Sequence, residues 1–217
     1  MSEVLTFSVT FHTPFRVATG SASEGADVAV DRRVPVPGSS LKGAMRAAAR
    51  DVLGGLGPTA DRDGPDHPLI MEVFGRGQRL GDQQSDSPWH WEDVALASQT
   101  AGVGDEPRTA EPSLRNRIRI EAESGTAAQG ALMVAEEWAP TNGTVQLWQS
   151  GHVQPSRGEL HRALLSMAAA LMDGLGSGRR AGNGWVTLRP EGAWAPPWPR
   201  CVDLVLAVGD QQSEEQR

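Results

Sequence analysis

The chain has 217 residues, of which 39% are hydrophobic, and carries a formal net charge of -7 at pH 7. This length is enough for one substantial hydrophobic core, so we expect a single domain. No apolar run approaches the roughly 20 residues that a membrane span needs, and the first residues form neither a basic leader nor an apolar signal core. We therefore expect a cytoplasmic protein without a membrane partner. The single cysteine, Cys201, excludes a disulfide framework and is interpreted as a small core residue.

The negative charge is concentrated in one part of the chain. Residues 59–112 include 11 acidic and 4 basic side chains, whereas the rest of the chain has 16 of each. Composition alone disfavours a nucleic-acid partner, because phosphate neutralisation normally needs clustered lysine and arginine. Since the acidity is local, a positively charged face elsewhere on the molecule is still compatible with the sequence.

The first quarter of the chain predicts a strand, a long loop and a helix. Hydrophobic and polar residues alternate over residues 5–11, which is the period of a half-buried strand. Residues 16–36 are rich in glycine, serine and charge and indicate a loop. Ser39 or Ser40 then caps a predicted helix, in which apolar residues recur at helical spacing: Leu41, Met45, Ala48 and Val52.

Residues 57–112 are predicted to be a large acidic insertion that is partly flexible, because they are polar and rich in glycine, proline and aspartate. The insertion is interrupted by a short apolar piece at residues 69–74 and by a short predicted strand at residues 94–97.

The second half of the chain predicts a further helix between several strands. Ser156 and Glu159 have the spacing of a capping box in front of an apolar helical stripe. Strands are expected on both sides of this helix, at residues 115–122, 131–138, 145–148, 185–188 and 202–208.

The order strand, helix, strands, helix, strand is typical of an α+β domain of the ferredoxin-like or RNA-recognition type, here with a large acidic insertion. We predict one domain over residues 1–208 and a flexible tail at residues 209–217.

The start of the first helix is suited to binding a phosphate, because backbone N–H groups and the positive end of the helix dipole point outward there. Ser39 and Ser40 lie at this start, and Lys42, Arg46 and Arg50 follow at fourfold spacing on one helical face. The alternative is an amphipathic helix with a solvated basic side.

Five glycines and two arginines follow the second helix within residues 174–184. Glycine permits close approach of backbone amides to a phosphate or ribose, which makes Gly176, Gly178, Arg179 and Arg180 candidate contacts to such a group. The alternative is a flexible connection between helix and strand. The segment has no Gly-Lys-Ser or Gly-Lys-Thr ending and does not support a nucleotide-hydrolysing phosphate loop.

Arg115, Arg117 and Arg119 alternate along a predicted strand and therefore share one face of it. This face either lines an RNA groove or is simply solvated. His12, on the first strand, either faces a site or is a solvated histidine at the strand edge.

Four segments, in this order, carry a family resemblance: residues 35–46 (PVPGSSLKGAMR), residues 73–75 (VFG), residues 117–132 and the glycine-rich residues 174–184. They resemble the repeat-associated mysterious protein (RAMP) superfamily, and specifically the backbone subunit of the Csm and Cmr complexes of type III CRISPR systems. The resemblance implies a guide-RNA-binding subunit of an antiviral defense complex. The implied partners are guide RNA, target RNA, further copies of the chain and other type III CRISPR subunits.

The resemblance also implies an aspartate that cleaves target RNA, on the loop before the first motif. Asp27 matches this aspartate best by position, and Asp31 is second. Such a carboxylate could bind Mg²⁺ or Mn²⁺ beside a phosphate and help a ribose 2′-hydroxyl attack the phosphorus, which would make the chain an endonuclease, a hydrolase. The metal-binding candidate is Asp27.

Three alternatives to this cleavage stay open. The two aspartates can be solvated loop residues that pair with Arg32 or Arg33. The subunit can be purely architectural and bind guide RNA without cutting. It can also be a metal-independent guide-processing endoribonuclease that uses a histidine such as His12 as a general acid or base.

Overall fold

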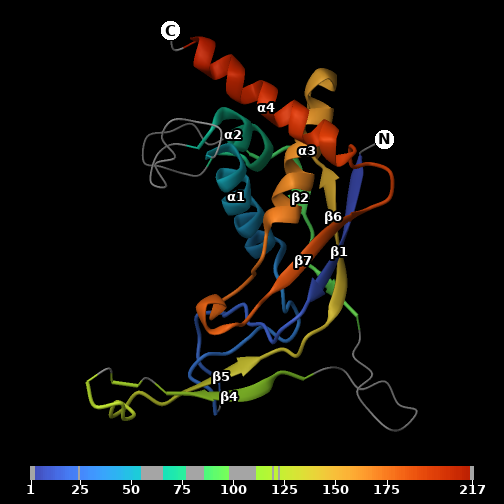
Figure 1. The fold of residues 1–217 in the computed structure, drawn as a ribbon. Coiled ribbons are helices and arrows are strands. Elements are labelled where there is room, and N and C mark those ends of the chain that lie inside the picture. Colours follow the sequence, from blue (N-terminus) through green and yellow to red (C-terminus); the bar gives the residue numbers. More distant parts are fainter. Residues whose placement is uncertain are drawn as a thin grey trace.

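The computed structural model describes residues 3–23, 25–54, 66–76, 86–97, 111–118, 120–121 and 123–215, with the backbone alone for residues 209–215 (Figure 1). Five strands form the central sheet: β1 (Val4–Phe11), β2 (Trp89–Trp91), β3 (Ala95–Leu96), β6 (Asn142–Gln149) and β7 (Val186–Glu191). Their order is β2-β6-β1-β7, with β3 also paired to β6, and every pairing is antiparallel.

The strand predicted at residues 5–11 is confirmed, and β1 is central to the sheet. Phe7 lies opposite Val145 of β6 on one side and Pro190 of β7 on the other. The alternate residues Leu5, Phe7, Val9 and Phe11 are buried, whereas the polar residues between them are only half-buried. One face of the sheet therefore supplies the hydrophobic core.

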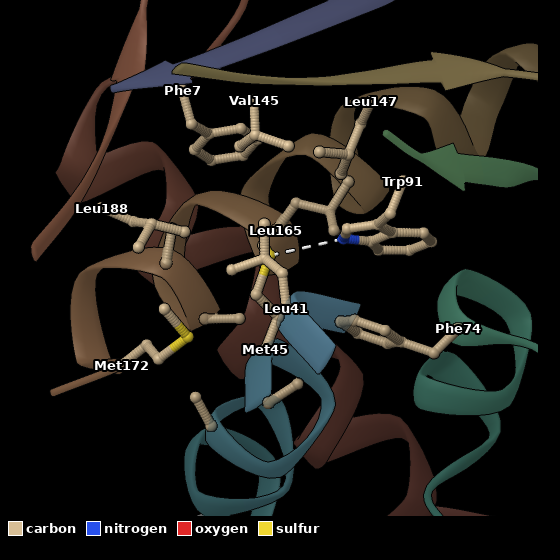
Figure 2. Close-up of a cluster of buried hydrophobic side chains, with 14 of the residues drawn as sticks. Phe7, Leu41, Met45, Phe74, Trp91, Val145, Leu147, Leu165, Met172 and Leu188 are labelled. Atoms are coloured by element: carbon tan, nitrogen blue, oxygen red, sulfur yellow. Dashed lines mark hydrogen bonds between the residues drawn. The ribbon is translucent and has the colours of Figure 1, made fainter. Parts of the chain in front are cut away.

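Four α-helices accompany the sheet: α1 (Gly38–Gly54), α2 (Pro68–Phe74), α3 (Pro155–Leu171) and α4 (Trp198–Glu215). Figure 2 shows side chains of the sheet and of α1 and α3 meeting in one cluster, which includes Phe7, Val145, Leu188, Leu41 and Leu165. Among the described helices, none is long and apolar enough to cross a lipid bilayer.

A second, two-stranded sheet lies at the end of the molecule opposite α4 (Figure 1). Its strands are β4 (Ser113–Arg117) and β5 (Met133–Glu137), with Arg115 opposite Ala135. The sequence predicted both strands, but β4 ends at Arg117 and not at residue 122.

The α+β class is confirmed by this combination of helices with antiparallel sheets. The assignment to the ferredoxin-like or RNA-recognition type stays a prediction. The strand order and the succession of β1, α1, β6, α3 and β7 are compatible with it.

The described parts of residues 57–112, the segment predicted as an acidic insertion, supply elements of the core, and the insertion itself stays a prediction. This part of the chain forms α2, β2 and β3 and buries Phe74, Trp89 and Trp91. The indole Nε1 of Trp91 donates to the sulfur of Met45 at 3.5 Å (Figure 2). The apolar piece noted at residues 69–74 corresponds to α2 and the strand expected at residues 94–97 contains β3, whereas β2 was not predicted. Residues 55–65, 77–85 and 98–110 lie outside the described residues.

The strand predicted at residues 202–208 is wrong, because these residues belong to α4. The residues at i, i+3, i+4 and i+7, which are Cys201, Leu204, Val205 and Val208, all contact the core. Cys201 is completely buried and is the core residue that was predicted, although on a helix. The segment predicted as a tail begins inside α4, whose backbone is helical as far as Glu215.

The two helices that the sequence predicted, α1 and α3, do not begin where it placed them. α1 begins at Gly38, so Ser39 and Ser40 lie inside its first turn. α3 begins at Pro155, and its N-cap Gln154 makes no side-chain capping bond. The predicted capping box is therefore wrong. Glu159 instead pairs with Arg200 of α4 at 2.9 Å.

A buried histidine joins α2, α3 and β2. The side chain of His161 is 1% exposed, and its Nδ1 accepts a hydrogen bond from Trp89 Nε1 at 3.2 Å. Its Nε2 therefore carries the proton and donates to Glu72 Oε1 at 2.8 Å. Burial lowers the pKa of His161, and the neighbouring Glu72 opposes this effect only in part. Hydrogen bonds from Arg157 lower the pKa of Glu72.

We expect the free energy of unfolding to fall as the pH is lowered below 6.5, the ordinary pKa of histidine. In this range the unfolded chain takes up a proton at residue 161 that the folded chain binds more weakly. Urea unfolding at several pH values between about 7.5 and about 5 would measure the effect. His161→Gln keeps a donor and an acceptor but does not titrate, so it should flatten the curve in this range. His152→Gln, at an exposed position, is the control. If the free energy of unfolding depended on pH equally in the two variants, His161 would not be the source of this dependence.

Candidate RNA-binding surface

The glycine-rich segment after α3 is a tightly fixed loop and not a loose connection. Gly176 has φ +91°, and a Cβ there would lie 2.3 Å from the carbonyl oxygen of Arg16. Gly184 has φ +71°, and a Cβ there would lie 2.1 Å from the carbonyl oxygen of Leu175. Ser177 N–H donates to Arg16 O at 2.9 Å, and Gly184 N–H donates to Pro14 O at 2.8 Å. Glycine is therefore required at position 176 for the loop to approach the start of the chain, and at position 184 for the two sides of the loop to approach each other.

The two arginines of this loop lie on a short 3-10 helix, η1 (Arg179–Ala181), between two glycines in the left-handed conformation, Gly178 and Gly182. Arg179 and Arg180 are exposed. Within the described part of the chain, neither guanidinium forms an ion pair. The loop thus presents two unneutralised cations on a fixed backbone.

A buried carboxylate, Glu137 of β5, connects this loop to the two-stranded sheet. Its side chain is 2% exposed and accepts hydrogen bonds from Arg117 at 2.8 Å and from Asn183 at 2.7 Å. Arg115 and Arg16 lie farther away, at 3.7 and 3.9 Å. One negative charge therefore faces three arginines, which leaves a positive surplus around this carboxylate.

Arg16 is the most buried of the three arginines. Its Nε donates to Ser177 Oγ at 2.9 Å, whereas its Nη1 has no hydrogen-bond partner among the described residues. Burial lowers the pKa of Arg16, and the nearby Glu137 opposes this effect. The sequence did not single out Arg16, Glu137 or Asn183. The only available signal was the Glu136-Glu137 pair in β5, since adjacent strand residues face opposite ways and these two carboxylates cannot both face solvent on one side.

The predicted arginine stripe is confirmed for the described residues. Arg115 and Arg117 lie on the face of β4 that bears Glu137, and the Arg115 side chain is 61% exposed. Arg119 lies outside the described residues.

The basic residues of α1 share one face as predicted, but an acid already pairs with two of them. Arg46 and Arg50 both bind Asp66, with Arg46 Nε 2.8 Å from Asp66 Oδ2. Burial by itself would raise the pKa of Asp66, but the hydrogen bonds from the two arginines outweigh it and lower that pKa. Lys42 lies over the ring of Trp91, 5.0 Å from the centroid, and burial lowers its pKa.

The N-terminus of α1 is also occupied by an acid. Gly38 N–H donates to Asp93 Oδ1 at 2.8 Å, and a Cβ at Gly38 would lie 2.4 Å from the carbonyl oxygen of Trp91. The N–H of Ser40 donates to Pro37 O at 3.0 Å. An RNA phosphate near Ser39 and Ser40 would therefore have to compete with the Asp93 carboxylate.

The two candidate catalytic aspartates have different surroundings. Asp27 is exposed, and its Oδ2 accepts the N–H of Val134 of β5 at 2.8 Å. Asp31 Oδ1 accepts the N–H groups of Val34 and Arg33, and these bonds lower the pKa of Asp31. Asp31 therefore stabilises a turn, whereas Asp27 keeps one carboxylate oxygen without a described hydrogen bond.

The described residues do not form a metal site by themselves. They contain no group of three or more histidine, cysteine, aspartate or glutamate side chains that could hold an ion. A single carboxylate such as Asp27 would depend on oxygen ligands from RNA to bind Mg²⁺ or Mn²⁺, so the metal stays a prediction.

Comparison with known proteins agrees with the resemblance noted in the sequence. No curated protein matches the chain. One chain of a cryo-EM structure of the apo state of type III-B Cmr-beta has 14% identity and a TM-score of 0.60, over 88% of this chain and 98% of that one. A chain of Cmr-beta bound to cognate target RNA has 14% identity and a TM-score of 0.57, over 93% and 98%. At this identity the likeness shows a shared fold. The family model of the RAMP superfamily matches residues 8–187, and the chain therefore belongs to the RAMP superfamily.

Proposed function

We propose that the chain is a guide-RNA-binding subunit of a type III CRISPR interference complex. Membership of the RAMP superfamily and the shared fold with chains of type III-B Cmr-beta support this assignment. One of those complexes is described as bound to cognate target RNA. The proposed partners are guide RNA, target RNA, other subunits of the complex and further copies of this chain.

The observation that carries the proposal is the group of arginines at one end of the molecule. Arg179 and Arg180 are exposed on η1. Arg115 and Arg117 lie on the two-stranded sheet of β4 and β5, which the hydrogen bond between Asn183 and Glu137 joins to the glycine-rich loop. Arginines on a fixed backbone suit repeated contacts to phosphate and sugar, which need no particular base sequence. This explains how a chain with a net negative charge could bind RNA.

The finer assignment is that the chain is the repeated backbone subunit and that the assembled complex cuts target RNA at Asp27. Head-to-tail contacts between identical subunits produce open filaments, which matches a protein that repeats along a guide. The exposure of Asp27 and its uncommitted carboxylate oxygen favour this residue over Asp31. The architectural subunit, which binds without cutting, is the alternative.

Replacing Arg179 and Arg180 together with alanine should weaken binding of single-stranded RNA about a hundredfold or more, since hydrogen bonds to charged groups contribute about 1.5–3 kcal/mol each. The loss should be similar for different RNA sequences. Affinity measured by fluorescence anisotropy checks this.

Arg200→Ala is the control, because Arg200 is on α4 at the other end of the molecule and pairs with Glu159. Equal affinities for the double variant and the control would contradict the role of η1. Absence of RNA binding by the wild-type chain, alone and in its complex, would contradict the proposed function.

A further inference from the structure

A groove of about 720 Å³ lies beside the glycine-rich loop. Its walls come from the end of α3, from η1 and from the region where β1 and β7 meet, and its polar and aromatic side chains are His12, Asp173, Arg179, Arg180, Trp185 and Thr187. The volume is within the range of about 300–1,000 Å³ that is typical of small-ligand sites. The combination of an aromatic ring with cations suggests an aromatic anion.

Trp185 is held by its backbone but exposes its ring. Its N–H donates to Thr13 Oγ1 at 3.0 Å, and its carbonyl accepts the N–H of His12 at 2.9 Å. On its other side, Val186 N–H donates to Asp173 O at 3.1 Å. The residue is nevertheless 58% exposed. An indole that is open to solvent on a fixed backbone is suited to stacking against a planar ligand.

The charges that line the groove favour an anion. Arg179 and Arg180 supply two positive charges against the single negative charge of Asp173. The stem of Arg179 packs on Gly174, where an added Cβ would lie 2.8 Å from Arg179 Cδ. Gly174 therefore lets Arg179 lie close against the wall of the groove.

Polar groups between the ring and the cations can contact the edge of a base. His12 Nε2 shares a hydrogen bond with Thr187 Oγ1 at 2.7 Å, which fixes the imidazole and leaves Nδ1 available. The Asp173 side chain is exposed at the same groove. The free ring nitrogen of His12 and the carboxylate of Asp173 therefore offer hydrogen-bonding groups to the edge of a base.

We propose that this groove binds one nucleotide of the guide RNA, with its base stacked on Trp185 and its phosphate at Arg179 and Arg180. This inference rests on the proposed function and adds base contact to a surface otherwise suited to the RNA backbone. A free mononucleotide has the same chemistry, and the experiment distinguishes it from a strand.

The test compares single-stranded RNA with an abasic ribose-phosphate oligomer of the same length, by fluorescence anisotropy. Trp185→Ala should bind RNA about fivefold to a hundredfold more weakly than wild type, because it loses the stack between a base and the indole. Trp185→Phe should keep most of the affinity. Trp198→Ala is the matched control, because Trp198 is 50% exposed on α4 and does not line the groove. The abasic oligomer should bind wild type and Trp185→Ala equally.

The outcomes separate the two hypotheses. Wild type that binds no RNA would overturn the proposed function. Wild type that binds RNA, with Trp185→Ala equally tight, would overturn the groove assignment alone. If Trp185→Ala lost affinity for the abasic oligomer by the same factor as for RNA, Trp185 would not stack on a base. If a mononucleotide displaces the RNA at micromolar concentration only when Trp185 is present, the ligand is a free nucleotide and the assignment to a strand is wrong.

Discussion

Glu137→Ala is expected to lower the free energy of unfolding by about 3–5 kcal/mol, the usual cost of removing one partner from a buried ion pair. Glu137 is the only carboxylate described beside Arg16, and Arg16 already has a nitrogen without a hydrogen-bond partner. Without Glu137, the guanidinium of Arg16 stays buried beside Arg117 with no opposite charge. Asn183 also loses its hydrogen bond to Glu137, so the glycine-rich loop and the two-stranded sheet should both become less stable.

Denaturant unfolding monitored by circular dichroism would measure this loss. Glu159→Ala, which removes an exposed partner of Arg200, is the control and should leave the midpoint nearly unchanged. Adding Arg16→Met to Glu137→Ala should restore part of the stability, because the buried cation is then gone. Equal midpoints for Glu137→Ala and Glu159→Ala would show that the carboxylate does not hold this end together.

Asp27→Asn should slow cleavage of complementary target RNA by the assembled complex about a hundredfold or more, the usual effect of losing a catalytic acid or base. Asparagine keeps an oxygen that accepts the N–H of Val134, so the loop geometry should be retained while the charge is lost. Affinity for target RNA should hardly change, because it depends on base pairing and many phosphate contacts. Cleavage and binding are therefore expected to separate in one variant.

Asp31→Asn is the matched control. It also keeps an acceptor for the N–H groups of Arg33 and Val34. Cleavage rates are measured with Mg²⁺ or Mn²⁺ and again with EDTA, which tests the predicted metal requirement. Loss of cutting in Asp31→Asn alone would assign catalysis to Asp31. Full activity in both variants would remove cleavage from this loop, and a wild-type complex that never cuts would favour the architectural subunit.

The elements with strong periodicity could be predicted from the sequence. β1, α1 and α3 each carry several large apolar residues at the spacing of their secondary structure, and all three are in the structure. α4 was mistaken for a strand because valine and leucine dominate it, although its buried residues follow a helical period. α2 and β2 are too short for a period to show against their polar surroundings.

The candidate site could be predicted only in part, for a related reason. Local spacing correctly placed Arg46 with Arg50, and Arg115 with Arg117. Their acidic partners come from distant parts of the chain, since Asp66 and Glu137 reach these arginines only through the tertiary fold. No local pattern reports such long-range pairing, so the sequence could not show which cations were already neutralised.

The pairing of Arg46 and Arg50 with Asp66 affects how many salt ions are released when RNA binds. A phosphate that reaches an unpaired arginine frees counterions into solution, and this release makes affinity depend on salt concentration. A phosphate that reaches Arg46 or Arg50 would replace the Asp66 carboxylate, so one anion would be exchanged for another with little net release. The slope of log affinity against log salt concentration would then reflect the arginines of η1 and of the two-stranded sheet. The number of phosphate contacts deduced from this slope would be smaller than the number of basic residues in contact with RNA.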